Sequence, residues 1–286
     1  MGLILWLVTE QTPNYCTRKP PEGQVSVTLD RILDLARERA ADLRPQRAAL
    51  ERVVADAAAP PDFEAALKRQ RVAIVAEIKR RSPSAGVINP SLDARALART
   101  YARRGASAIS VLTDAPFFGG SLDDLRDVAL AVGCPALRKD FIVSEEQLLE
   151  ARAAGAAAAL LIVRALQQAA LAHLVNFARD TGLAALVEAH DAEEIQRALD
   201  AGATIIGVNS RDLDTFSVDV PRALALLAHV PVACVAVAES GVHSRDDVER
   251  AAAAGADAVL VGSALSGARE PGALLETLTT VTRHAR

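Results

Sequence analysis

The sequence predicts a (β/α)8 TIM barrel, in which eight parallel strands close into a ring that helices surround. Short apolar runs recur at intervals of 21 to 35 residues, segments with helical spacing separate them, and Gly-Ala pairs precede four of them. Each run is continuously apolar rather than alternating, which is typical of strands covered on both faces. Eight such units in about 190 residues favour a closed barrel over a flat, doubly wound sheet.

The apolar runs are the predicted strands. Active sites of this fold lie where the strands end, so the residues that close the runs are the candidate functional residues and those that open them are packing residues. In chain order, the runs are Ala73–Lys79, Ala108–Thr113, Ala136–Asp140, Ala158–Val163, Leu183–Ala189, Thr204–Asn209, Cys234–Ser240 and Ala258–Ser263.

Start and stop signals predict the helices between the strands. A side chain at the start of a helix can accept a hydrogen bond from a free backbone N–H. The side chain three positions later can in turn accept from the backbone N–H of that first residue. A glycine before a strand can end the preceding helix in the left-handed conformation. The start pairs are Ser121 with Asp124, Ser144 with Gln147, Asp191 with Glu194, and Ser244 with Asp247; the glycines are Gly105, Gly155, Gly202 and Gly255.

An additional N-terminal helical segment is expected before the barrel. Leu29, Ile32, Leu33 and Ala36 have amphipathic spacing, so this helix covers either the bottom or the top of the barrel. Residues 1–26 are expected to be an extension, either disordered or a mis-assigned start, and residues 27–286 one barrel domain. The apolar start of the chain resembles the h-region of a signal peptide, but it lacks a basic n-region and an obvious cleavage site and is too short to span a bilayer.

Composition narrows the function classes. The chain has 286 residues, of which 51% are hydrophobic and 24% charged, enough for one large core. The net charge of −4 argues against a nucleic-acid binder. Three cysteines without CxxC spacing are expected to be small buried hydrophobes in a reducing compartment. These observations predict a cytoplasmic protein with no membrane contact, and no obligatory protein partner is evident from the sequence.

Small residues after the last two predicted strands indicate a phosphate site. Ser240-Gly241 and Gly262-Ser263 leave backbone N–H groups open to an anion. Either pair alone is equally well explained as turn residues. Together they predict a phosphorylated small-molecule substrate.

Two lysines and a glutamate at separate strand ends indicate acid–base chemistry. Lys79 and Lys139 close otherwise apolar runs, where a solvated surface charge is not expected. Burial and neighbouring cations are expected to lower the pKa of such a lysine, which suits a general acid or a Schiff-base nucleophile. Glu188 is the corresponding base or electrostatic partner. A structural ion pair is the alternative for each residue taken alone.

Seven segments, in order, resemble the indole-3-glycerol phosphate synthase family of tryptophan biosynthesis. The resemblance runs from about residue 27 to the C-terminus and leaves only the first 26 residues or so outside it. The segments are VAEIKRRSPSAG (75–86), SVLTDAPFFGGS (110–121), PALRKDFIV (135–143), ALVEAHD (185–191), IGVNSRDLDTF (206–216), AESG (238–241) and VGSAL (261–265).

The resemblance implies a decarboxylating ring closure without a metal or an organic cofactor. Carboxyphenylamino-deoxyribulose phosphate becomes indole-3-glycerol phosphate, and carbon dioxide and water leave. By similarity, Lys139 is the general acid at the ribulose carbonyl, and Glu188 stabilises the cationic intermediate and acts as the base in dehydration. Lys79 contacts the substrate and serves as the acid for the departing hydroxyl. Glu77 and Asn209 orient these groups by hydrogen bonds.

The resemblance also implies how the substrate is bound. Ser82 and Arg211 hold the anthranilate-derived end. Independently of the resemblance, the basic loop between Lys79 and Leu92 is predicted to act as a lid, because its cations match a doubly anionic substrate. The phosphate lies on Ser240, Gly241, Gly262 and Ser263, and the aromatic ring on an apolar wall of Leu112, Phe118, Leu137, Phe141 and Leu160.

Other conspicuous residues receive structural interpretations. The five histidines show no metal-ligand spacing, and His190 is expected to face solvent. The charged residues of 31–52 are interpreted as a solvated helix face. The chain contains neither a G-x-G-x-x-G motif nor a P-loop, so no nucleotide cofactor is expected.

Two alternatives remain open from the residues alone. One is a different phosphosugar barrel, either an isomerase of the same pathway or an aldolase that uses Lys139 as a Schiff base. The other is a barrel that binds a phosphometabolite without converting it. The presence of both lysines and Glu188 argues against this second alternative.

Overall fold

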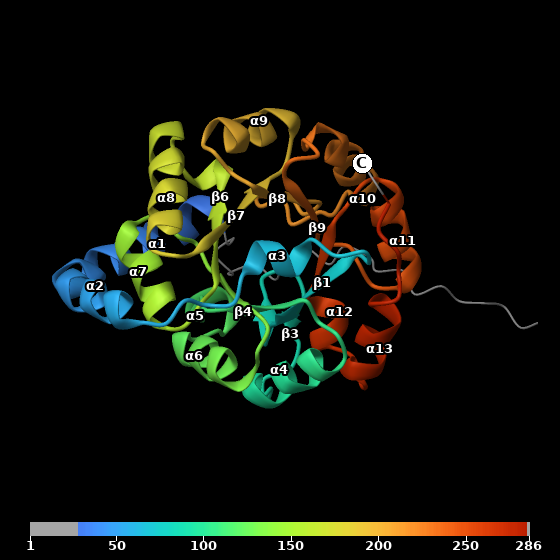
Figure 1. Cartoon of the computed structure of the whole chain (residues 1–286), viewed down its shortest axis with the longest axis horizontal. Coiled ribbons are helices and arrows are strands. Elements are labelled where there is room, and N and C mark those ends of the chain that lie inside the picture. Colours follow the sequence, from blue (N-terminus) through green and yellow to red (C-terminus); the bar gives the residue numbers. More distant parts are fainter. Residues whose placement is uncertain (1–27, 285–286) are drawn as a thin grey trace, which may run out of the picture.

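A computed structural model describes residues 28–284 as a closed barrel of eight parallel strands ringed by helices (Figure 1). Each strand lies within its predicted run, so the predicted fold is confirmed. The expectations for residues 1–26, including Cys16, lie outside the described residues. The strands are β1 (Ala73–Ile78), β4 (Ala108–Leu112), β5 (Ala136–Lys139), β6 (Ala158–Ile162), β7 (Ala184–Ala189), β8 (Ile205–Asn209), β9 (Val235–Glu239) and β10 (Ala258–Val261).

The helix signals act as predicted. The side chains of Ser121, Ser144, Asp191 and Ser244 each accept from the N–H three residues later, and Ser244 with Asp247 forms a complete capping box. The four glycines have φ between +84° and +96°. The main outer helices are α4 (Ala94–Arg103), α6 (Leu122–Ala131), α7 (Glu145–Ala153), α8 (Gln168–Asp180), α9 (Ala192–Asp200), α10 (Val220–Leu226), α11 (Arg245–Ala253) and α13 (Pro271–Leu278).

Shorter elements complete the chain. A small antiparallel hairpin, β2 with β3, lies between β1 and α4, and short helices follow several strands. None of the helices within residues 28–284 is long and apolar enough to cross a membrane. The shorter elements are β2 (Arg81–Ser82), β3 (Gly86–Val87), α5 (Ala115–Phe118), α12 (Ser263–Ser266), and the 3-10 helices η1 (Arg44–Gln46), η2 (Val163–Ala165) and η3 (Leu227–His229).

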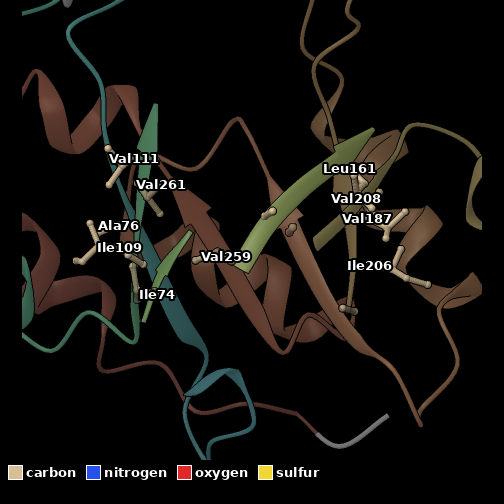
Figure 2. Close-up of a cluster of buried hydrophobic side chains, with 14 of the residues drawn as sticks. Ile74, Ala76, Ile109, Val111, Leu161, Val187, Ile206, Val208, Val259 and Val261 are labelled. Carbon is tan, nitrogen blue, oxygen red and sulfur yellow. The ribbon is translucent and has the colours of Figure 1, made fainter. Parts of the chain in front are cut away.

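Alternation along the strands divides the buried side chains into two cores. Outward-facing residues such as Ile74, Val187 and Val259 pack between the barrel and its helices (Figure 2). Inward-facing residues such as Val75 and Leu186 fill the barrel interior. Since successive side chains point to opposite faces of a strand, the inward set continues to the strand ends and decides which polar residues reach the barrel mouth.

The N-terminal segment supplies three helices: α1 (Leu29–Leu43), α2 (Arg47–Asp56) and α3 (Phe63–Leu67). Of the two positions expected for the first helix, α1 takes the top, because Leu29 and Ile32 line the cavity at the strand ends. The sequence did not predict α3. Its Phe63 and Leu67 pack with residues that open strands, and α3 contacts β1 and β4, so it covers the bottom of the barrel (Figure 1).

Two expectations for individual side chains were wrong. The charged residues of 31–52 are not all solvated: Arg39 binds the buried Asp140, with Nη2 at 3.0 Å from Oδ2, and Arg47 binds Glu146 at 3.2 Å. Asp140 and Glu146 both come after β5 in the chain. The sequence of α1 and α2 therefore could not indicate that Arg39 and Arg47 bind them. Cys134 and Cys234 are half-buried rather than fully buried.

Candidate active site

A cavity of about 800 Å³ opens at the carboxyl ends of the strands. Leu137 is the only sequence-predicted site residue that does not line it. It lies on the inward face of β5 two residues before Lys139, and is therefore fully buried one layer deeper in the barrel. The predicted residues that line the cavity are Glu77, Lys79, Ser82, Leu112, Phe118, Lys139, Phe141, Leu160, Glu188, Asn209, Arg211, Ser240, Gly241, Gly262 and Ser263.

Lys139 lies at the centre of the polar part of the cavity. Its Nζ is 3.2 Å from Glu188 Oε2 and also donates to Glu239. Burial acts to lower the pKa of Lys139, but the charges of Glu239 and Glu188 outweigh burial and raise the pKa above its ordinary value. The expected lowering of this pKa was therefore wrong, because the closest charged neighbours are carboxylates rather than cations.

The two carboxylates on Lys139 differ in their protonation. Burial raises the pKa of Glu239 to about 7; Lys139 opposes this shift and Glu188 adds to it. Burial also acts to raise the pKa of Glu188, but Lys139 and then His190 outweigh it, and the net pKa is lowered. The site therefore combines one protonated lysine, one ionised carboxylate and one carboxyl group that titrates near neutrality.

Glu239 was not among the residues selected from the sequence as catalytic. It closes an apolar strand, as Glu188 does, so the same signal was present. What the sequence did not reveal is that both carboxylates, from β7 and β9, meet the ammonium group of Lys139 on β5.

Glycines make room for the buried carboxylates. A Cβ on Gly207 would lie 2.1 Å from Glu239 Oε1, and a Cβ on Gly262 would lie 2.2 Å from Glu77 Oε1. The same oxygen of Glu77 lies 2.7 Å from Lys79 Nζ. Gly262, which the sequence assigned to phosphate binding, is thus also required by the packing of the polar pair beside it.

The end of the cavity formed after β9 and β10 has the small residues expected for anion binding. Ser240 and Gly241 both have positive φ, of 65° and 73°. Gly262 is the residue before α12, which begins at Ser263. A Cβ at Gly262 would lie 2.9 Å from Lys79 Nζ, so this end of the cavity also has a cation beside it.

The other end of the cavity is more apolar. The rings of Phe118 and Phe141 lie 6.2 Å apart between centroids. Arg211 Nη1 donates to the carbonyl of Phe216 at 2.9 Å, and burial lowers the pKa of Arg211. Arg211 follows β8, next to β9 in the barrel, whereas the two phenylalanines follow β4 and β5. Its partly desolvated guanidinium suits an anionic group.

Contrary to the sequence interpretation, the arginines of the basic loop after β1 do not face the cavity. Arg80 binds Asp124 and the carbonyl of Leu92, and Arg81 binds the carbonyl of Pro116, so these cations hold neighbouring segments instead of facing a ligand. Ser82 and the next three residues do line the cavity. Movement of this loop as a lid stays a prediction.

His190 was wrongly expected to face solvent. Its side chain is only 5% exposed, with Nδ1 at 3.0 Å from Glu194 Oε2 and Nε2 at 3.5 Å from Glu188 Oε1. Burial acts to lower the pKa of His190, but Glu194 and Glu188 outweigh it and raise the pKa. The turn after β7 redirects the chain, so the alternation of the strand no longer indicates which way this residue points.

Across residues 28–284, no group of three or more histidine, cysteine, aspartate and glutamate side chains is arranged to hold a metal ion. The closed barrel and the titratable groups at its mouth define a (β/α)8-barrel enzyme. A family model of indole-3-glycerol phosphate synthase matches residues 29–278. The chain belongs to the indole-3-glycerol phosphate synthase family.

Individual relatives agree with this assignment. The chain is 50% identical to the indole-3-glycerol phosphate synthase of Micrococcus luteus, with 83% of this chain and 91% of the relative covered. It is 48% identical to that of Streptomyces griseus, with 90% and 96% covered. Among solved structures, a 3-hexulose-6-phosphate synthase shares the fold at 19% identity and a TM-score of 0.58, with 73% of this chain and 98% of that chain covered.

Proposed function

We propose that this protein converts 1-(2-carboxyphenylamino)-1-deoxyribulose 5-phosphate to indole-3-glycerol phosphate, with loss of carbon dioxide and water. The observation that carries the proposal is the ammonium group of Lys139, held between Glu188 and Glu239 on the wall of the cavity. Membership of the indole-3-glycerol phosphate synthase family supports the same reaction.

The cavity suggests one orientation of the substrate. The phosphate lies on Ser240, Gly241, Gly262 and Ser263, and the carboxylate of the anthranilate ring faces Arg211 and Ser82. The ring itself packs on the apolar wall. This wall consists of Leu112, Phe118, Phe141 and Leu160, without the buried Leu137.

In this orientation Lys139 drives ring closure. As the aromatic carbon attacks the ribulose carbonyl, negative charge develops on the carbonyl oxygen, and a positioned ammonium stabilises that charge most in the transition state. The raised pKa keeps Lys139 protonated at neutral pH, so it has a proton to give. The carboxylate then leaves as carbon dioxide, and the electrons of the broken bond restore the aromatic ring.

Dehydration needs a second acid and a base. Lys79, ion-paired with Glu77, protonates the departing hydroxyl. Glu188, which stays ionised beside Lys139, first stabilises the cationic intermediate and then takes a proton from it. Asn209 and Glu77 orient these groups.

The aldolase alternative fits the site less well. A Schiff-base lysine must lose its proton before it can attack a carbonyl. Two flanking carboxylates hold Lys139 in the protonated form, which opposes this step. Borohydride trapping in the presence of substrate is expected to leave no covalent adduct on Lys139.

The proposed setting is the cytoplasm, with the barrel acting on a small phosphorylated substrate without a cofactor or an obligatory protein partner. The purified protein, mixed with carboxyphenylamino-deoxyribulose phosphate alone, is expected to produce indole fluorescence that grows with time. A folded protein that gives no signal with this substrate would contradict the proposed function and favour another phosphosugar substrate.

Gly207 offers a test of the glutamate geometry. Gly207→Ala is expected to lower turnover on the order of 10²-fold, because the new methyl group displaces Glu239 from Lys139. Steady-state kinetics with thermal melting measures the effect. Gly133→Ala, at a position with nothing within 4 Å, is the matched control and should leave turnover unchanged. Normal turnover in Gly207→Ala would show that the site tolerates movement of Glu239.

A further inference from the structure

Two buried carboxylates share the same lysine, and their surroundings differ. A hydrogen bond from Asn209 helps to lower the pKa of Glu188 but does not act on Glu239. Glu188 and Glu239 both bind Lys139, and both side chains are almost completely buried. His190 lies on the far side of Glu188, with Nε2 at 3.5 Å from Oε1. The corresponding oxygen of Glu239, Oε1, has no hydrogen-bond partner among the described residues and lies against Gly207.

The orientation of His190 is set by Glu194. Glu194 Oε2 accepts from the backbone N–H of His190 at 2.7 Å and lies 3.0 Å from its Nδ1. The hydrogen bonds from His190 and Arg164 outweigh burial and lower the pKa of Glu194 to about 2, so at neutral pH it is a carboxylate that only accepts. The proton of a neutral His190 therefore resides on Nδ1.

This arrangement determines what Nε2 presents to Glu188. His190 Nε2 has no hydrogen-bond partner in the described chain. In the neutral ring, Nε2 would direct a lone pair toward the nearby carboxylate oxygen of Glu188. In the imidazolium ring, Nε2 carries a proton and a favourable charge toward the same oxygen. Three charged groups act on this ring from the elements around it: Glu188 on β7, Glu194 on α9, and Arg164 in η2, which itself binds Glu194 at 3.0 Å.

We propose that His190, held by Glu194, is a positioning residue that selects Glu188 rather than Glu239 as the ionised carboxylate beside Lys139. In its protonated form, which Glu194 and Glu188 favour, the ring stabilises charge on Glu188 and leaves Glu239 as the carboxyl group that can hold a proton. The role of the base in the proposed dehydration then falls to Glu188. The consequence for catalysis rests on the proposed function, whereas the distribution of protons between the two glutamates does not.

His190→Gln removes the charge but keeps a side chain that can donate a hydrogen bond. We expect the acidic limb of the pH profile of kcat/KM to move upward by about one pH unit or more, since an opposite charge at this distance has been lost. NMR titration of labelled glutamate carboxyl carbons, assigned with Glu188→Gln and Glu239→Gln, should show Glu188 titrating at higher pH and Glu239 at lower pH than in the unsubstituted protein.

Two further variants complete the test. Glu194→Gln keeps the ring but removes the carboxylate that holds its charge, and it should shift both titrations in the same directions even if His190→Gln fails to fold. His229→Gln, on the exposed side of η3, is the matched control and should shift neither. Glutamate titrations that do not move in either folded variant would overturn the proposal. Shifted titrations in a protein that does not convert the substrate would instead contradict the proposed function alone.

Discussion

Lys139→Ala is expected to lower the turnover of carboxyphenylamino-deoxyribulose phosphate by about 10² or more, while the barrel remains folded. The variant loses the only ammonium group that contacts both Glu188 and Glu239 in the described part of the chain, and with it the proton donor to the ribulose carbonyl. Steady-state kinetics by indole fluorescence, with circular dichroism to check the fold, measures this effect.

Removal of Lys139 also leaves two buried carboxylates without their cation. They are expected to take up protons, because burial disfavours an unpaired charge. Lys139→Met, which keeps most of the side-chain volume, separates this effect from the loss of packing and should be equally inactive. Lys68→Ala, which removes a half-exposed lysine paired with Glu64 at 2.6 Å outside the cavity, is the control. Near-normal turnover in folded Lys139→Ala would remove Lys139 from the acid role.

Glu188→Gln is expected to lower kcat by about 10² or more and to change KM only a few-fold. Glutamine keeps the shape and the hydrogen-bonding capacity of the side chain, but it can neither accept the proton in dehydration nor balance the charge of the intermediate. Glu239 still binds Lys139, so the lysine stays in place and substrate binding should be largely retained. Separate determination of kcat and KM distinguishes the two effects.

The same measurement on Glu249→Gln provides the control, since Glu249 pairs with Arg245 on the surface of α11 at 3.0 Å. An unchanged kcat in Glu188→Gln would contradict the proposed role of Glu188. A rise in KM with kcat intact would mean that Glu188 only binds substrate.

Much of the barrel could be predicted from local sequence. Strand positions follow from apolar runs, and the helix starts at Ser121, Ser144, Asp191 and Ser244 follow from one side chain and its nearest backbone N–H groups. The apolar runs and the helix-start pairs are both signals carried by residues a few positions apart. For that reason the strands all fell within their predicted runs, whereas α3, whose burial depends on the barrel floor, was missed.

The candidate site could be predicted only in part. The strand ends identified the polar residues that line the cavity, because the fold itself brings these ends together. The sequence did not reveal that Leu137 lies below the cavity, that Arg80 binds Asp124 instead of facing the cavity, or that His190 is buried behind Glu188. Each of these depends on the direction of a side chain relative to a segment distant in the sequence.

The sequence by itself therefore determined the barrel, the end at which its functional groups gather and, through the resemblance, its family. The tertiary structure alone decided the charge states. Lys139 lies among carboxylates from β7 and β9, so its pKa rises where burial alone would lower it. Electrostatic interactions act through space at a few ångströms and weaken with distance, so a protonation state depends on which distant segments the closed barrel brings together.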